Sequence, residues 1–217
     1  MRTEILDGLT IDDLYTNKNY LVRNLFLDRI QTALDLADIN DNSVILDIGC
    51  GSGHLLRSIR EFSRKCECWA TDILDSKIME TVDCKFQVAD ARKLPFEDGY
   101  FDVVFTLDIL EHIQHNVDLA IKEVRRVLKP NGIAILSGPT ESKFYRFCRS
   151  ILFFLERNNH QRRETQRQNI VYIPHYHTVY QLEDKFMKYA FTLSRARSLP
   201  GFPLPPLFRV SRFRNQV

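Results

Sequence analysis

Three glycines and an aspartate in the first quarter of the chain have the types and the spacing that a ligand site requires. Gly49, Gly51 and Gly53 follow the apolar run 44–46, and Asp47 comes two residues before the first glycine. Glycines at this spacing let the backbone turn tightly and approach a ligand without side-chain collision. The pattern predicts a ligand-binding turn between a strand and a helix; a tight turn without a ligand is the alternative.

The spacing of these glycines separates the turn from one that binds dinucleotides. His54 stands where the dinucleotide pattern G-x-G-x-x-G has its third glycine. The carboxylate of Asp47 would repel a pyrophosphate, but it suits a ligand that carries an ammonium group and a sulfonium. S-adenosylmethionine is such a ligand. An NAD(P)-dependent oxidoreductase is the alternative from another reaction class, and the short-chain type would also need a Tyr-x-x-x-Lys pair, which this sequence does not supply.

Two further acids end the next two strand-like segments. Asp72 closes the segment 69–72, 19 residues after Gly53, and Asp90 closes the segment 86–90. In an open α/β sheet such positions face the ligand crevice, where Asp72 would accept the ribose hydroxyls and Asp90 the adenine amine. The alternative for Asp72 is a cap on the following helix.

Histidines offer proton acceptors near neutral pH. We expect His112 to be the base if the acceptor is a hydroxyl, with a histidine that makes one backbone bond at a helix start as the alternative. His177, directly before the helix cap Thr178, is a second candidate. The pair His175-x-His177 has no third histidine or paired acid at a recognisable zinc spacing, so we expect no metal.

Strands alternate with helices along most of the chain, which indicates a mainly parallel α/β sheet covered on both faces. We expect an N-terminal helical part (1–40), a cofactor-binding core (41–139) and an acceptor-side lid with the final strands (140–217), all in a single domain. Strands are expected at 43–47, 66–71, 85–88, 101–106, 133–136, 191–198 and 207–213, and helices within 11–39, after 53, after 75, at 119–128 and at 178–189. The proline-rich link 200–206 suggests a hairpin-like ending with one antiparallel edge strand.

Composition bounds the class of protein. No apolar run approaches the ~20 residues that cross a bilayer, and acids interrupt the first apolar stretch, so we expect neither a membrane span nor a secretory signal. The five cysteines form no C-x-x-C pair and predict neither a disulfide framework nor a thiolate zinc site. These features favour a cytoplasmic protein.

Charge is distributed unevenly. Residues 1–139 hold 16 Lys and Arg against 23 Asp and Glu, whereas residues 140–217 hold 14 against 5. Within the basic part, the segment 144–167 mixes arginines with large apolar residues, which suits either a lid over the crevice or a contact with an amphiphilic, anionic acceptor or an acidic membrane surface. Nucleic acid is not an expected partner, because no RNA-binding motif accompanies the charge.

Longer motifs place the chain near a known family. The segments D-A-R-K-L-P-F-E-D-G-Y-F-D-V-V (90–104) and E-V-R-R-V-L-K-P-N-G (123–132) resemble the D-A-x-x-L-P-F-x-D-x-x-F-D-V-V and E-x-x-R-V-L-K-P-x-G of class I S-adenosylmethionine-dependent methyltransferases, in the branch that includes quinone-biosynthesis enzymes. The resemblance covers about residues 43–138. It implies a Rossmann-like, doubly wound sheet of seven strands with one antiparallel strand, helices on both faces and an N-terminal helical cap.

The resemblance also implies a set of cofactor contacts around the methionine, ribose and adenine of S-adenosylmethionine. These are Asp47, Gly49, Cys50, Gly51, Gly53, Asp72, Ile73, Asp90, Ala91, Leu107 and Asp108. The implied activity is methyl transfer, with S-adenosylhomocysteine as product. The absence of the nucleobase amino-methylation motif favours O- or C-methylation of a small molecule, lipid or glycan. A non-catalytic S-adenosylmethionine-binding partner subunit is the alternative that keeps the fold.

Overall fold

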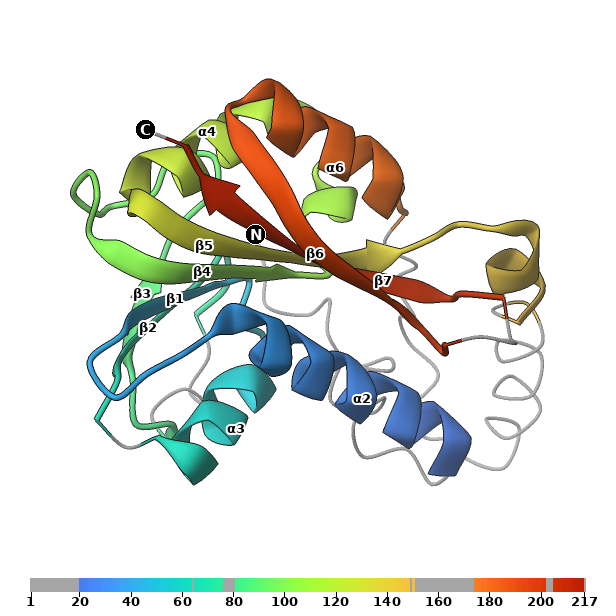
Figure 1. Cartoon of the computed structure of the whole chain (residues 1–217), viewed down its shortest axis with the longest axis horizontal. Coiled ribbons are helices and arrows are strands. Elements are labelled where there is room, and N and C mark those ends of the chain that lie inside the picture. Colours follow the sequence, from blue (N-terminus) through green and yellow to red (C-terminus); the bar gives the residue numbers. More distant parts are fainter. Residues whose placement is uncertain are drawn as a thin grey trace.

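The computed structural model describes residues 20–63, 65–75, 81–148, 150, 174–201 and 205–216. At its centre lies a seven-stranded sheet in the order β3-β2-β1-β4-β5-β7-β6 (Figure 1). The strands are β1 (Val44–Ile48), β2 (Glu67–Asp72), β3 (Lys85–Val88), β4 (Phe101–Leu107), β5 (Leu128–Pro139), β6 (Phe191–Leu199) and β7 (Phe208–Asn215). β1 to β5 pair in parallel, and β7 is antiparallel to both of its neighbours. The predicted Rossmann-like sheet with one antiparallel strand is confirmed.

The place of the antiparallel strand differs from the expectation. β6 and β7 do form a hairpin-like pair, but β7 inserts between β5 and β6, and β6 is the edge strand. The burial of the two strands matches this order. Most side chains of β7 are buried, whereas β6 is largely exposed and carries Arg195 and Arg197, and charged side chains on an edge strand hinder pairing with another chain.

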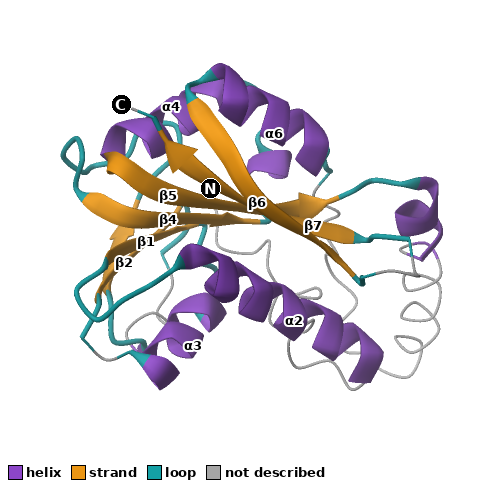
Figure 2. Cartoon of the chain, viewed as in Figure 1, coloured by secondary structure: helices purple, strands orange, loops and turns teal. Residues whose placement is uncertain are grey.

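Helices cover both faces of the sheet (Figure 2). α2 (Tyr20–Ala37) and α3 (His54–Phe62) lie on one face; α4 (Val117–Val127), α6 (Val179–Lys188) and the short 3-10 helix η2 (Leu110–His112) lie on the other. Successive strand residues point to opposite faces, so Ile45 packs in the cluster with α2 and α3, and Leu46 in the cluster with α4 and α6. Asp47 therefore points to the face that α2 and α3 cover.

Local sequence signals set the start of the helices on the second face. Thr178 caps α6 as predicted: its hydroxyl accepts from Gln181 N at 3.2 Å, and the Gln181 side chain accepts from Thr178 N at 2.9 Å, which is a capping box. Asn116 precedes α4, but it adopts a left-handed backbone (φ 62°) and makes no side-chain cap.

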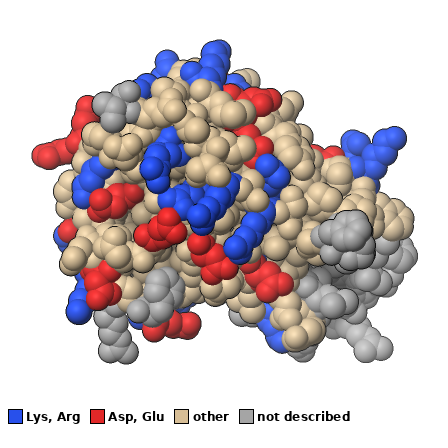
Figure 3. All heavy atoms as spheres, viewed as in Figure 1, with Lys and Arg blue, Asp and Glu red and all other residues tan. Residues whose placement is uncertain are grey.

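The basic C-terminal part and the acidic N-terminal part meet each other. Arg197 of β6 pairs with Asp35 of α2 at 3.1 Å, and Arg212 of β7 pairs with Asp38. In Figure 3 basic side chains gather over the middle of the face where Figure 1 places β6 and β7, with acidic ones beside them. Part of the predicted charge asymmetry is thus neutralised within the fold.

Two expectations fall on residues outside the described ranges. The helix expected after Asp75 would begin at 76–80, and most of the basic, apolar segment 144–167 lies in 151–173. Among the helices that the structure does describe, none combines the length and the apolar character that crossing a bilayer requires.

Candidate functional site

The glycine turn is held in place by backbone hydrogen bonds to the end of β2. The N–H groups of Gly49 and Cys50 donate to the Thr71 carbonyl at 2.7 and 3.1 Å, and Gly51 N–H donates to Oδ2 of Asp72 at 3.0 Å. Gly49, Gly51 and Gly53 all have left-handed φ angles, between 50° and 74°, which residues with a Cβ rarely adopt. The turn therefore needs its glycines for conformational reasons.

We expect Gly49→Ala to destabilise the chain and to weaken ligand binding at the turn. A Cβ at this position would lie 2.4 Å from Cδ1 of Ile109, on a backbone with φ +73°. Steric overlap and left-handed strain together predict a loss of about 1–3 kcal/mol, read as a lower midpoint in thermal denaturation. The matched control is Gly201→Ala, where a Cβ meets no atom within 4 Å. Equal midpoints for the two variants would contradict the steric account.

Asp47 is a buried acid beneath this turn. It is 4 % exposed, and burial, with a smaller effect from the nearby Asp72 carboxylate, raises the pKa of Asp47 to about 7. A carboxyl whose charged form lacks solvation gains most from a cationic partner. The geometry is thus suited to the ammonium-bearing ligand that the sequence predicted.

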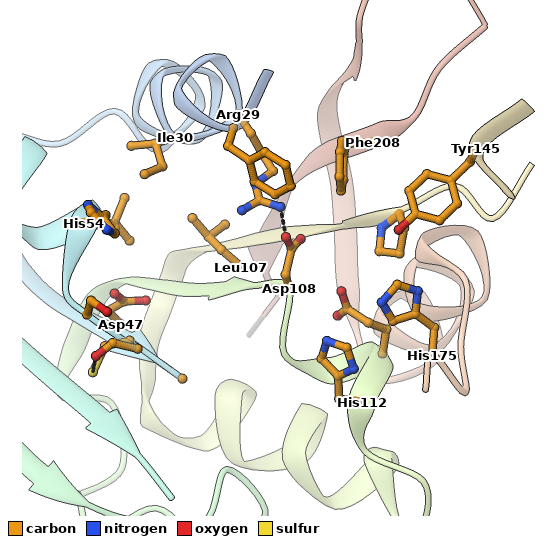
Figure 4. A pocket seen from close by; sticks show the side chains of 18 residues that line it. Arg29, Ile30, Asp47, His54, Leu107, Asp108, His112, Tyr145, His175 and Phe208 are labelled. Atoms are coloured by element: carbon orange, nitrogen blue, oxygen red, sulfur yellow. Dashed lines mark hydrogen bonds and ion pairs between the residues drawn. The ribbon is translucent and has the colours of Figure 1, made fainter. Parts of the chain in front are cut away.

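The turn opens into a cavity of about 180 Å³. Its walls come from the glycine turn, from α2, from η2 and the end of β4 (Figure 4). The end of β5 with the segment that follows it, the segment before α6 and the start of β7 complete them. The predicted cofactor residues that line it are Asp47, Gly49, Cys50, Gly51, Leu107 and Asp108. Apolar rings also take part: Phe26, Tyr145 and Phe208.

A buried ion pair that was not predicted from the sequence lines this cavity. Arg29 of α2 is 2 % exposed and forms an ion pair with Asp108, which follows β4 (Figure 4). Ser137 Oγ donates to the other oxygen of Asp108 at 2.9 Å, and the Arg29 guanidinium stacks against Phe26 and Phe208. Asp108 has a left-handed backbone (φ 53°); non-glycine residues held this way concentrate at functional sites.

A cluster of polar side chains lies across the cavity from Asp47. In Figure 4 the rings of His112 and His175 lie beside each other, with centroids 4.9 Å apart. His112 Nδ1 lies 3.2 Å from the Pro174 carbonyl, and His175 Nδ1 lies 2.5 Å from Oε1 of Glu141. Burial lowers the pKa of His112. His112 was predicted from the sequence as a base, whereas no catalytic role was predicted for His175.

The other candidate base, His177, does not line the cavity. Burial, followed by the charge of Lys185, lowers the pKa of His177. His175 and His177 are two residues apart, yet the first faces the cavity and the second packs toward η2 and α6. The assignments of His112 and His177 as bases both stay predictions.

The remaining predicted cofactor residues are not among those that line the cavity. Both oxygens of Asp72 accept backbone N–H groups, from Gly51 at 3.0 Å and from Leu74 at 3.1 Å, which leaves lone pairs for ribose hydroxyls. Ile73 is 67 % exposed and offers an apolar surface to an adenine ring. Gly53 caps α3.

Asp90 forms hydrogen bonds and an ion pair with Arg92. Its carboxylate accepts from the backbone and the guanidinium of Arg92, at distances from 2.6 to 3.1 Å, and these hydrogen bonds lower the pKa of Asp90. Ala91 is buried in the core next to it. The proposed bond from Asp90 to adenine remains a prediction.

Comparison with known proteins gives similarity over the part of the chain that builds this turn. Residues 46–136 match the family described as methyltransferase domain. A sterol 4-C-methyltransferase of Caenorhabditis elegans is 37% identical over 103 residues, and a ubiquinone/menaquinone biosynthesis C-methyltransferase of Neisseria meningitidis is 35% identical over 112. These matches cover 44% and 48% of this chain.

The chain spans less than half the length of these relatives, 30% and 45% respectively. Among solved structures, an N-methyltransferase of Bradyrhizobium japonicum, crystallised with S-adenosylhomocysteine, superposes with a TM-score of 0.65 at 14% identity. That superposition covers 94% of this chain and 95% of the other. It extends the similarity in fold beyond the region of sequence similarity.

Proposed function

We propose that the core of this chain belongs to the class I S-adenosylmethionine-dependent methyltransferases. On this premise, the chain transfers the methyl group of S-adenosylmethionine to a carbon or an oxygen of an apolar or amphiphilic acceptor. The observation that carries the proposal is the glycine turn, with its backbone bonded to Asp72 and the buried Asp47 beneath it, at the mouth of a cavity. The cytoplasm is the proposed compartment, in keeping with five free cysteines.

Each part of the cofactor has a counterpart in this arrangement. Asp47 would face the ammonium group, Asp72 the ribose hydroxyls and the exposed Ile73 the adenine. Val88, the register partner of Asp72 on β3, is 51 % exposed and extends the apolar surface. The methyl group would then point into the cavity lined by Phe26, Tyr145 and Phe208.

The rings around the cavity support an acceptor with apolar surface, and the relatives named as C-methyltransferases favour transfer to carbon. Methyl transfer is an in-line displacement at an activated carbon, so most of the rate enhancement comes from positioning. An acceptor that must lose a proton needs a base, and His112 is the proposed one because it lines the cavity. The direct test is turnover: S-adenosylhomocysteine release is measured over a panel of phenols, quinols, sterols and glycans.

The raised pKa of Asp47 predicts that cofactor binding depends on pH. A bound ammonium group stabilises the carboxylate, so binding should release a proton, and the affinity for S-adenosylhomocysteine should rise by up to about eightfold from pH 6 to pH 7.5. The ligand's α-amino group stays mostly protonated over this range. Calorimetry in two buffers of different ionisation enthalpy counts the released protons.

Asp47→Asn is the matched variant, because it keeps the shape and removes the titration. Its affinity should be lower and nearly constant between pH 6 and 7.5. The same proton release in this variant would show that another group titrates on binding.

A further inference from the structure

Three side chains on the cavity wall offer an unassigned set of metal ligands. Glu111 and His112 come from η2 and His175 from the segment before α6, and one ligand atom from each lies within 4.8 Å of the other two. All three line the cavity. The expectation of no metal had considered only His175-x-His177, because nothing in the sequence brings Glu111 to His175.

Both histidines are anchored as metal ligands usually are. The Pro174 carbonyl and the Glu141 carboxylate are acceptors, so the Nδ1 atoms of His112 and His175 carry the protons that they donate. Each ring therefore keeps a lone pair on Nε2. A second bond from a ligating imidazole to a carbonyl or carboxylate is the common support of a metal site. Glu141 has a left-handed backbone (φ 51°), a strained conformation of the kind that recurs at ligand sites.

Glu111 supplies an independent observation. It is 1 % exposed, and neither carboxylate oxygen has a hydrogen-bond partner within the described part of the chain. Buried carboxylates without partners are rare and call for an explanation such as an ion. A cation between Glu111 and the two imidazoles would satisfy both the charge and the lone pairs.

We propose that Glu111, His112 and His175 bind one divalent transition-metal ion, with the remaining coordination positions open to the cavity. Two imidazoles and one carboxylate suit zinc, manganese or iron(II) better than calcium or magnesium. Donors around an ion with bonds of about 2.1 Å lie about 3.4 Å apart, so the cluster must contract by at most about 1.4 Å. In the open positions the ion would take an acceptor oxygen, such as that of a phenol or enol. His112 would then act as a ligand and not as a free base.

The test is metal binding to the full chain and does not require a known acceptor. The chelator-treated protein is titrated with Co²⁺, followed by visible absorption, and with Mn²⁺, followed by electron paramagnetic resonance. We expect one ion per chain. Glu111→Gln and His175→Asn should raise the dissociation constant at least tenfold, and Glu141→Gln about 10- to 100-fold. His177→Asn is the control and should bind as the unaltered chain does, because His177 lies outside the cavity.

The circular dichroism spectrum and the thermal midpoint of every variant show whether it is folded. Failure to bind either ion at one per chain would overturn the proposal and leave the cluster as a hydrogen-bonding site. Thiolate absorption bands with cobalt, or unchanged affinity in His175→Asn, would overturn it too, since the ion would then lie elsewhere. The inference does not depend on methyl transfer: metal binding without adenosyl binding would reject only the proposed function.

Discussion

Asp72→Ala is expected to weaken binding of S-adenosylhomocysteine by about 100-fold or more. Each hydrogen bond from a ribose hydroxyl to a charged acceptor contributes about 1.5–3 kcal/mol, and two such bonds would be lost. The variant also frees Gly51 N–H, which donates to this carboxylate at 3.0 Å, so the glycine turn loses one of its anchors. Calorimetry gives the dissociation constants of S-adenosylhomocysteine for the unaltered chain and for the variant.

The control for this variant is Asp75→Ala, three residues farther along and exposed. It removes the same charge from the same segment and should leave the affinity within about twofold, as surface changes away from a site usually do. If Asp72→Ala binds within about threefold of the unaltered chain, the ribose assignment is wrong and Asp72 serves the turn alone.

Arg29→Met should cost more stability than Gly49→Ala. Removing one partner of a buried ion pair leaves an uncompensated charge, at a cost of about 3–5 kcal/mol, here that of Asp108. The loss should appear as a fall of roughly 6–20 °C in the thermal midpoint. Because Arg29 joins α2 to the end of β4 above the cavity, adenosyl binding should weaken as well.

Two variants isolate the cause. Arg23→Met changes another arginine of α2, one that stacks on Tyr20, and should shift the midpoint little. Arg29→Met combined with Asp108→Asn should recover part of the loss, since no charge is then left unpaired. A double variant as unstable as the sum of the single ones would show that the packing of Arg29 on Phe26 and Phe208 matters more than its charge.

The glycine turn and its two acids could be predicted from the sequence, because local residue types determine their conformation. The glycine turn, Asp47 and Asp72 lie within 26 consecutive residues, and each lies in or directly after a strand whose apolar pattern is visible. The same holds for the capping box of Thr178 and Gln181. In these cases neighbours along the chain determine the conformation, so the sequence contains the information.

The other part of the site depends on contacts between distant segments. Arg29 pairs with Asp108, and His175 hydrogen-bonds to Glu141. The residue pattern of one segment does not indicate which distant segment it will contact. The prediction of His177 as a base had the same limit, because an irregular segment has no fixed alternation of sides. The order of β6 and β7 in the sheet could not be predicted from the sequence either. Both strands contain arginines among apolar residues, and only packing against β5 decides which strand is interior.

Calorimetric titration of the chain with S-adenosylmethionine, S-adenosylhomocysteine and NADH tests the central claim most directly. The turn geometry, the buried Asp47 and the exposed Ile73 predict dissociation constants in the micromolar range for both adenosyl ligands, weakened by Asp72→Ala but not by Asp75→Ala, and no heat with NADH. Tight binding of NADH, with no response to either adenosyl ligand, would contradict the assignment of this chain to methyl transfer.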